Sequence, residues 1–277
     1  MELRVSFRNV LQITVLAVGL ISASSALASE KLELTHTVYL GGLYVGNVKT
    51  DIIQKDGTYR IESRARTSET WNWLFDWIAE GQSQGLISAE LIRPEKHTYQ
   101  SAWNGKKRGA FIDYSSSGQV EYKLIGKPNL NLEKYTPLDL ASIHQSMDPM
   151  SMMLVVSETL QKGGPCVGTY PLFDGRRRFD VTLSPVSEII FGRSDYSVFE
   201  GKAIGCKIEI DKKGGFKRNS NYELPQDGEL ILWVGSPVDG GRIVPVRMEM
   251  ATSFGVAELH LAKYSYGDTK LASKNAE

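Results

Sequence analysis

Asp-Gly pairs placed between runs of alternating apolar and polar residues are the feature that most constrains how this chain folds. A two-residue type I′ hairpin turn needs positive φ at both central positions, and Asp followed by Gly tolerates this backbone well. The flanking runs, such as 44–54 with 58–66, alternate with the period of a half-buried strand. The pairs are Asp56-Gly57, Asp174-Gly175, Asp227-Gly228 and Asp239-Gly240.

This pattern predicts antiparallel hairpins in series. A parallel sheet would require strands that alternate with helices, and the sequence lacks that order. We therefore expect a mainly β fold, either a single curved antiparallel sheet or an open β-barrel with one or two short helices. Further strands are expected at 97–104, 108–114, 119–125, 196–210 and 255–264.

A first helix is predicted in the segment SETWNWLFDWIAEG, where Ser68 can act as the N-cap. Large apolar residues occupy both faces of this segment at helical spacing, which is typical of a buried helix. Those on one face are Trp71, Leu74, Phe75 and Ile78, and those on the other are Trp73 and Trp77.

A second helix is predicted in MDPMSMMLVVSETLQKGG. Asp148 can cap it, Pro149 fits its first turn, and Gly163-Gly164 ends it. The helix would fill the mouth or the concave side of the sheet, although its methionines also suit contact with a ligand. Met150, Met153, Leu154 and Leu160 would lie near one face.

The first 28 residues have the plan of a signal peptide. Arg4 and Arg8 precede the apolar run 10–21, and Ala26-Leu27-Ala28 forms an A-x-A cleavage site. The run is shorter than the roughly 20 residues that span a bilayer. We expect cleavage after Ala28, a single β-rich domain over 29–277, a periplasmic location and no membrane span in the mature chain.

Export gives the two cysteines their meaning. In an oxidising compartment an even number of cysteines indicates a disulfide, so Cys166 is expected to pair with Cys206. The alternative, a metal pair or redox thiols, suits a cytosolic chain, and the sequence has no C-x-x-C motif.

Composition and motifs exclude several classes of function. The formal net charge is zero, unlike the basic domains that bind nucleic acid. The four histidines are scattered singly, so we expect neither a metal nor a cofactor. The segment 81–85 matches the G-x-S-x-G pattern of hydrolases around Ser83, but that motif works on a parallel sheet that this chain lacks. We expect a protein that is not an enzyme, with a serine hydrolase using Ser83 as a weaker alternative.

The run Arg176-Arg177-Arg178, which follows Asp174-Gly175, leaves two interpretations open. Strand alternation places Arg177 on the face shared by Phe179, Val181 and Leu183, so it needs a carboxylate or carbonyl partner. In the structural interpretation Arg177 pairs with an acidic residue while Arg176 and Arg178 stay solvated. In the functional one the run is a cationic patch for an anionic headgroup, a glycan or a partner.

The order of several short motifs resembles the DUF3108 family of exported proteins of Gram-negative, proteobacterial origin. The resemblance implies a β-rich, barrel-like periplasmic protein with no assigned molecular function and supplies no catalytic residues. Its motifs here are Tyr39-Leu40-Gly41-Gly42, Val45-Gly46, the Trp-Leu-Phe segment, Asp148-Pro149-Met150-Ser151, Cys166, Phe173 to Asp180, Gly201 with Cys206, Pro245-Val246-Arg247 and Phe254-Gly255.

The sequence thus favours a non-enzymatic periplasmic protein that binds a lipid-like ligand, or an envelope partner, in an apolar concavity and contributes to envelope maintenance. The alternative is a structural protein that assembles through an exposed strand edge. The residues expected to contact a ligand are Trp71, Trp73, Phe75 and Trp77 as lining, with Arg177 as a polar anchor.

Overall fold

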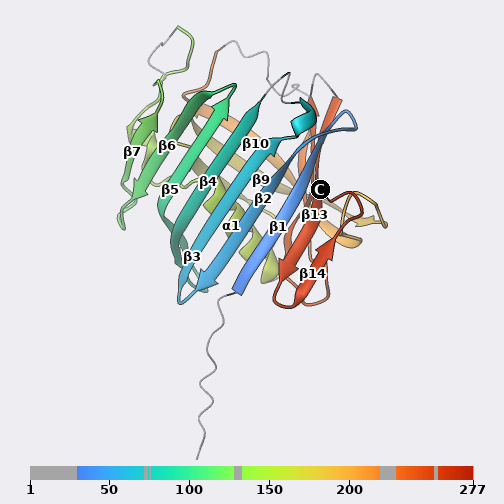
Figure 1. Ribbon diagram of the computed structural model, residues 1–277. Helices are drawn as coiled ribbons and strands as arrows, with labels where there is room; N and C mark the ends of the chain where they lie inside the picture. The colour runs from blue at the N-terminus through green and yellow to red at the C-terminus, as the bar shows by residue number, and fades with distance from the viewer. Residues whose placement is uncertain are drawn as a thin grey trace, which may run out of the picture.

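The computed structural model describes residues 30–71, 74, 76–127, 133–218, 229–252 and 255–276. The described strands form one antiparallel sheet in the order β7-β6-β5-β4-β3-β2-β1-β13-β12-β11-β10-β9-β8, with β14 paired to β13 (Figure 1). The strands are β1 (Glu30–Leu40), β2 (Leu43–Lys55), β3 (Thr58–Thr67), β4 (Trp77–Ile87), β5 (Ile92–Trp103), β6 (Lys106–Tyr114), β7 (Val120–Ile125), β8 (Gly168–Phe173), β9 (Arg178–Phe191), β10 (Gly201–Gly214), β11 (Leu230–Gly235), β12 (Val244–Thr252), β13 (Gly255–Tyr266) and β14 (Thr269–Ala272).

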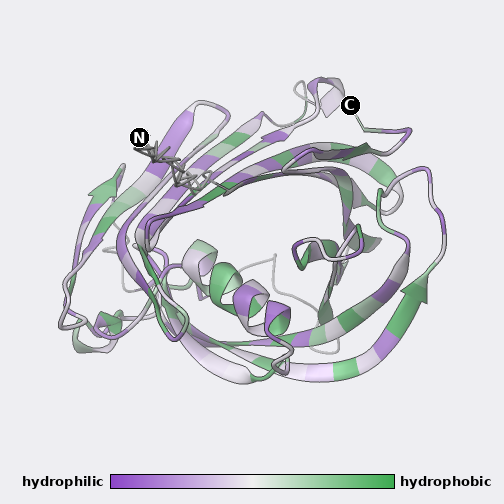
Figure 2. Ribbon diagram, turned by 90° about the horizontal axis from the view of Figure 1, so that it is seen from below, coloured by the Kyte–Doolittle hydropathy of each residue, from purple (hydrophilic) through white to green (hydrophobic). Residues whose placement is uncertain are grey.

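The sheet curves around the single α-helix that the described residues form, α1 (Pro149–Gln161) (Figure 2). Two short 3-10 turns, Glu69–Trp71 and Ala141–Ile143, complete the described elements. The prediction of a curved, mainly β fold with one or two short helices is confirmed. No helix among the described residues is long and apolar enough to cross a bilayer.

The helix lies on the concave side of the sheet, as predicted, and Asp148 is its N-cap. It is buried on more than one side because strands surround it, so the single apolar face expected from the sequence is too narrow. The buried members are Ser151, Met152, Leu154, Val156 and Leu160. Met152, Val156 and Leu160 pack with Leu172, Leu183, Leu232 and Val234 from β8, β9 and β11.

The helix predicted over residues 68–78 is wrong. The chain makes only a 3-10 turn at Glu69–Trp71, and β4 begins at Trp77. Residues 77–87 pair with β3 and β5, so Trp77 and Ile78 point to opposite faces of a sheet. The apolar residues of this segment fit helical spacing, but they belong to a turn followed by the start of a strand. Residues 72, 73 and 75 lie outside the described part of the chain.

The two ends of the sheet meet by packing instead of by strand pairing. The hairpin between β8 and β9 lies on β6 so closely that a Cβ added to Gly175 would come 2.1 Å from the Ala110 Cβ. Phe173 at the end of β8 packs edge-on to Tyr122 of β7, with ring centroids 5.0 Å apart. The first and last strands of this path therefore overlap, and the sheet is an open barrel.

The Cys166–Cys206 disulfide is present, as predicted. It joins the segment after α1 to β10, and both cysteines are buried in the cluster that contains Met152 and Leu232. The bridge closes a separation of 40 residues, which predicts a stabilisation of about 4 kcal/mol from the restricted unfolded chain.

We expect the double variant Cys166→Ala/Cys206→Ala to stay folded but to lose up to about 4 kcal/mol of unfolding free energy, because the unfolded chain regains loop entropy. Urea unfolding followed by tryptophan fluorescence measures the loss. The wild-type protein after thiol reduction should match the variant. Unchanged stability in both would contradict this assignment of the disulfide.

A buried histidine gives the fold a dependence on pH. His36 of β1 is 5% exposed, and its Nε2 donates to the Pro245 carbonyl at 2.9 Å. Burial lowers the pKa of His36 from 6.5 to about 4, against the weaker opposite effect of this hydrogen bond. Between these two values the unfolded chain binds a proton that the folded chain does not, so stability falls as the pH falls.

The free energy of unfolding should therefore drop by about 2 to 3 kcal/mol on account of His36 between pH 7 and pH 4.5. Other groups add to the measured drop, so the wild type is compared with His36→Gln, whose amide can still donate to Pro245. Urea titrations at both pH values should give a smaller drop for the variant. Equal drops would show that His36 does not carry this effect.

Candidate functional site

A buried polar cluster connects the first turn of α1 to the sheet. Asp148 Oδ1 accepts from the Ser83 hydroxyl at 2.6 Å and from the backbone N–H groups of Met150 and Ser151 at 3.0 and 2.9 Å. Its Oδ2 accepts from the Ser151 hydroxyl at 2.6 Å. The carboxylate is fully buried, and four hydrogen bonds compensate for the lost hydration.

The hydrogen bonds donated to Asp148 determine the donor and acceptor roles of the outer members of the cluster. The Ser151 hydroxyl donates its one hydrogen bond to Asp148, so it accepts a hydrogen bond from the Tyr59 hydroxyl at 2.7 Å. The Ser83 hydroxyl likewise accepts from His97, whose Nδ1 lies 2.8 Å away. Burial raises the pKa of Tyr59 far above its usual value, so this phenol remains a donor.

The cluster contains a serine, a histidine and an aspartate, but their connections differ from those of a hydrolytic triad. In a triad the imidazole lies between the nucleophile and the carboxylate. Here Ser83 donates directly to Asp148, and its side chain has no exposure to solvent. This geometry gives no support to a hydrolase that uses Ser83, and it identifies the cluster as an anchor for α1.

Replacing Asp148 with Ala should destabilise the protein by about 3 kcal/mol or more, because the helix loses its cap and buried donors lose their acceptor. Thermal unfolding followed by circular dichroism measures the change. The matched control is Asp139→Ala, which removes an exposed carboxylate that accepts from the Ala141 N–H. Similar losses in the two variants would contradict the anchoring role.

The inner face of the sheet is the face on which α1 and this cluster lie. We call the end of the sheet where β4 begins at Trp77 and β5 ends at Trp103 the rim. The strand register shows which residues between α1 and the rim lie on the inner face. The α1 helix ends near the opposite end, where Lys162 Nζ donates to the Ala89 carbonyl in the turn between β4 and β5. The helix therefore fills the half of the concavity away from the rim.

Apolar side chains on the inner face near the rim keep part of their solvent exposure. Met248 pairs with Leu259, and Leu259 pairs with Val38, so all three share one face across β12, β13 and β1. Inner-face residues beside the helix, such as Leu34 and Ile61, are by contrast buried. The residues that are partly exposed near the rim include Val38, Val48, Met250 and Leu259. Ile208 and Met248 are also partly exposed, but they pack against the cluster that contains Met152 and Leu232.

Two of the tryptophans expected to contact a ligand can be placed. Trp77 lies on the inner face at the rim and is half-buried. Trp71 is half-buried in the 3-10 turn, and its Nε1 donates to the Tyr44 carbonyl at 2.7 Å. The structure thus brings Trp77 to the concavity, and it engages Trp71 in a contact within the chain. Trp73 and Phe75 lie outside the described residues.

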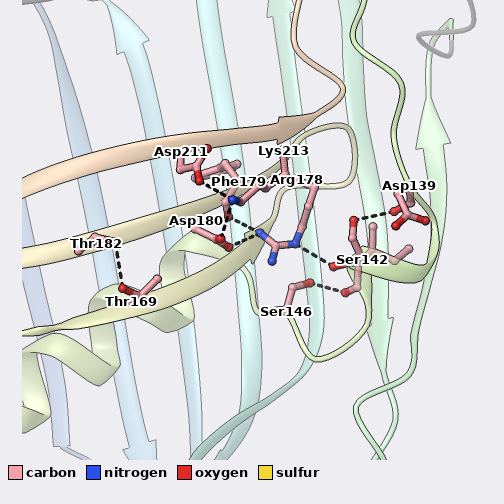
Figure 3. A network of polar contacts seen from close by, with 11 residues as sticks. Asp139, Ser142, Ser146, Thr169, Arg178, Phe179, Asp180, Thr182, Asp211 and Lys213 are labelled. Atoms are coloured by element: carbon pink, nitrogen blue, oxygen red, sulfur yellow. Dashed lines mark hydrogen bonds and ion pairs between the residues drawn. The ribbon is translucent and has the colours of Figure 1, made fainter.

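The arginine run adopts an arrangement that the sequence did not predict. Arg178, expected in solvent, is 8% exposed, and it donates to the Ser142 and Phe179 carbonyls and to Asp180 (Figure 3). Arg177, expected on the apolar face, is instead exposed, but it does pair with a carboxylate, Asp174, at 2.7 Å. The Asp174 N–H donates to the Arg177 carbonyl at 3.2 Å, so Gly175 and Arg176 are the central residues of the turn, and Asp174 Oδ1 also accepts from the backbone N–H groups of Arg176 and Arg177.

The turn is shifted by one residue from the expected Asp174-Gly175 centre, which leaves Arg177 at the end of the hairpin and outside β9. Only Gly175 of the Asp-Gly pair has positive φ, at 88°, and β9 begins at Arg178. The segment that carries Ser142 covers the Arg178 side of β9, so this face is not open to solvent (Figure 3). Strand alternation alone could not show that a distant segment covers this arginine.

Two further residues at the rim, Trp103 and Arg108, belong to no motif that the sequence analysis identified. Trp103 pairs with Trp77 and with Lys106, and Ser101 pairs with Arg108, so all of them share the inner face. Trp103 is 53% exposed, and Arg108 is exposed as well. The turn Asn104-Gly105, with φ of 46° and 76°, was the available signal that β5 ends beside Trp103.

The outer face carries two hollows of about 430 and 260 Å³. The larger one is lined by charged residues of β1, β2, β13 and β14, among them Glu33, Lys49 and Lys263. The smaller one lies between residues 191–199 and the pair Arg247 and His260. Neither includes a tryptophan, so neither coincides with the predicted lining. No group of side chains in the described ranges could hold a metal ion.

These features define a class of protein, an open antiparallel β-barrel with a helix anchored in its concavity. The chain belongs to the family described as "Protein of unknown function (DUF3108)", whose model matches residues 35–262. The curated proteins contain no match.

A solved structure has a similar fold, the "Beta-barrel-like Protein of Domain of Unknown Function DUF1849" from Brucella abortus. The two chains share 14% identity and superpose with a TM-score of 0.52, over 87% of this chain and 99% of the other. At this identity the likeness concerns the fold alone.

Proposed function

We propose that this chain is a non-enzymatic binding protein of the bacterial periplasm that holds a lipid-like ligand against the inner face near the rim and thereby contributes to envelope maintenance. The main support for this proposal is the partial exposure of apolar side chains on a concave face, where Met250 and Leu259 line one wall. Concave apolar surfaces with a few polar groups are the usual sites for such ligands. The buried disulfide supports an oxidising compartment.

The edges of the sheet favour this function over assembly by strand addition. On β8, Met147 bonds to the Pro171 carbonyl and the Phe173 N–H, and Pro171 itself has no N–H to offer. On β7, the Val120 N–H bonds to the His144 ring and the Ile125 carbonyl accepts from Arg176. Because the chain covers much of the edges of β7 and β8 itself, little backbone remains at these two ends for an added strand.

A pair of variants on adjacent residues tests the ligand site. Met250 faces the concavity, and Ala251 faces the outside of the same strand. We expect Met250→Glu to weaken binding of a fluorescent C16 fatty-acid probe at least tenfold, because a carboxylate would be placed against the acyl chain. Ala251→Glu should bind as the wild type does.

The measurement is a titration of delipidated protein, with circular dichroism to confirm that each variant is folded. Native mass spectrometry of protein taken from its own envelope identifies any bound lipid. The proposal fails if the delipidated wild type binds neither the probe nor any lipid from an envelope extract. It also fails if both variants weaken binding equally.

A further inference from the structure

The corner where the two ends of the sheet overlap gathers positive charge at the rim. The hairpin between β8 and β9 lies against Ala110 of β6, and its Arg176 donates to the carbonyls of Ile125 and Lys127 at 2.6 and 2.8 Å. These bonds hold the partly buried guanidinium of Arg176 beside β6 and β7. Two backbone carbonyls therefore hold the Arg176 side chain in place.

Arg108 lies in the same corner. On β6, Arg108 lies on the same inner face as Ala110 and closer to the rim. The partner of Arg108 on β5 is Ser101, and the partner of Ala110 is Tyr99. Burial lowers the pKa of Arg176, and the charge of Arg108 lowers it further, which agrees with the closeness of the two cations. No carboxylate pairs with Arg108 in the described part of the chain, whereas Asp174 pairs with Arg177.

An aromatic surface adjoins these cations on the inner face. Trp77 and Trp103 are direct partners on β4 and β5, and Lys106 is the partner of Trp103 on β6. Side chains of direct partners lie about 5 Å apart at their Cβ atoms. Indole rings suit the boundary between an acyl chain and a polar group, because they combine a broad apolar surface with one N–H donor.

We propose that the ligand is an anionic amphiphile whose acyl chain lies on the apolar inner face beside Trp77 and Trp103, and whose phosphate or carboxylate group binds Arg108 in the corner next to Arg176. This inference rests on the proposed function and adds the chemical class of the ligand. Guanidinium groups bind phosphate and carboxylate through paired, charge-assisted hydrogen bonds.

The same geometry moves the polar anchor away from Arg177, where the sequence placed it. Arg177 is already bonded to Asp174, and its guanidinium lies 5.6 Å from the centroid of the Phe216 ring. A ligand at Arg177 would have to displace these contacts. Arg108 needs no such exchange and faces the concavity.

The test compares four probes on the delipidated full chain: palmitoyl-lysophosphatidylglycerol, palmitoyl-lysophosphatidylcholine, palmitate and inorganic phosphate. Quenching of tryptophan emission or titration calorimetry reports binding. Arg108→Gln removes the cation, and Arg64→Gln is the control, since Arg64 lies on the outer face of β3 with a side chain that is 73% exposed.

We expect Arg108→Gln to weaken binding of the lysophosphatidylglycerol about tenfold or more, since a hydrogen bond to a charged group contributes roughly 1.5–3 kcal/mol. Lysophosphatidylcholine should bind more weakly than lysophosphatidylglycerol and should respond little to the substitution. Arg64→Gln should leave every affinity unchanged. Loss of palmitate binding in Arg108→Gln would extend the site from phosphates to carboxylates.

Three outcomes overturn the inference, and they differ in what they leave standing. If the two lysolipids bind equally and Arg108→Gln changes neither affinity, the headgroup assignment is wrong while lipid binding remains. If no amphiphile binds, the proposed function fails as well. If inorganic phosphate binds through Arg108 and the amphiphiles do not, the corner is a site for free anions.

Discussion

The buried carboxylate of Asp148 links the start of α1 to the inner face of the sheet. Asp148 caps α1 and binds Ser83 of β4, while Ser151 of the helix binds Tyr59 of β3. Among the described residues, α1 makes side-chain contacts with the sheet at both ends: this cluster at its start, and Glu158 and Gln161 near its end, which contact Arg242 and Ile243. Apolar packing of Met152, Val156 and Leu160 holds the helix between these ends. Because the helix is held there, the half of the inner face near the rim stays uncovered by it.

The sequence predicted those parts of the structure that local rules determine. Alternation gave the hairpins and the antiparallel sheet, Asp148-Pro149 gave the start of α1, and the count of cysteines gave the disulfide. The first predicted helix failed because Trp71 to Ile78 fits helical spacing as well as it fits a turn followed by a strand. Periodicity cannot distinguish these alternatives over so short an apolar run.

The candidate site was predicted less well, because tertiary contacts create it. Ser83, His97 and Asp148 meet only when β4, β5 and the helix are in place, and nothing in their spacing indicates this. Arg178 is buried because a segment more than thirty residues earlier covers it. Arg108 gains its meaning from the overlap of β6 with the hairpin that carries Arg176, which is a property of how far the sheet curls.

The centre of the sheet is formed by the two ends of the described chain. β1 pairs with β13, so that Leu32 lies opposite Tyr266, and each is continuous with a meander on its own side. The first meander, β1 to β7, can form as the chain is synthesised. Its strand β1, however, lacks its second neighbour, β13, until nearly all residues have been made. Because closing so long a loop is slow, we expect the two halves to fold first and to join last. Under the proposed export, this order would leave the concave face incomplete until the last strands have crossed the membrane.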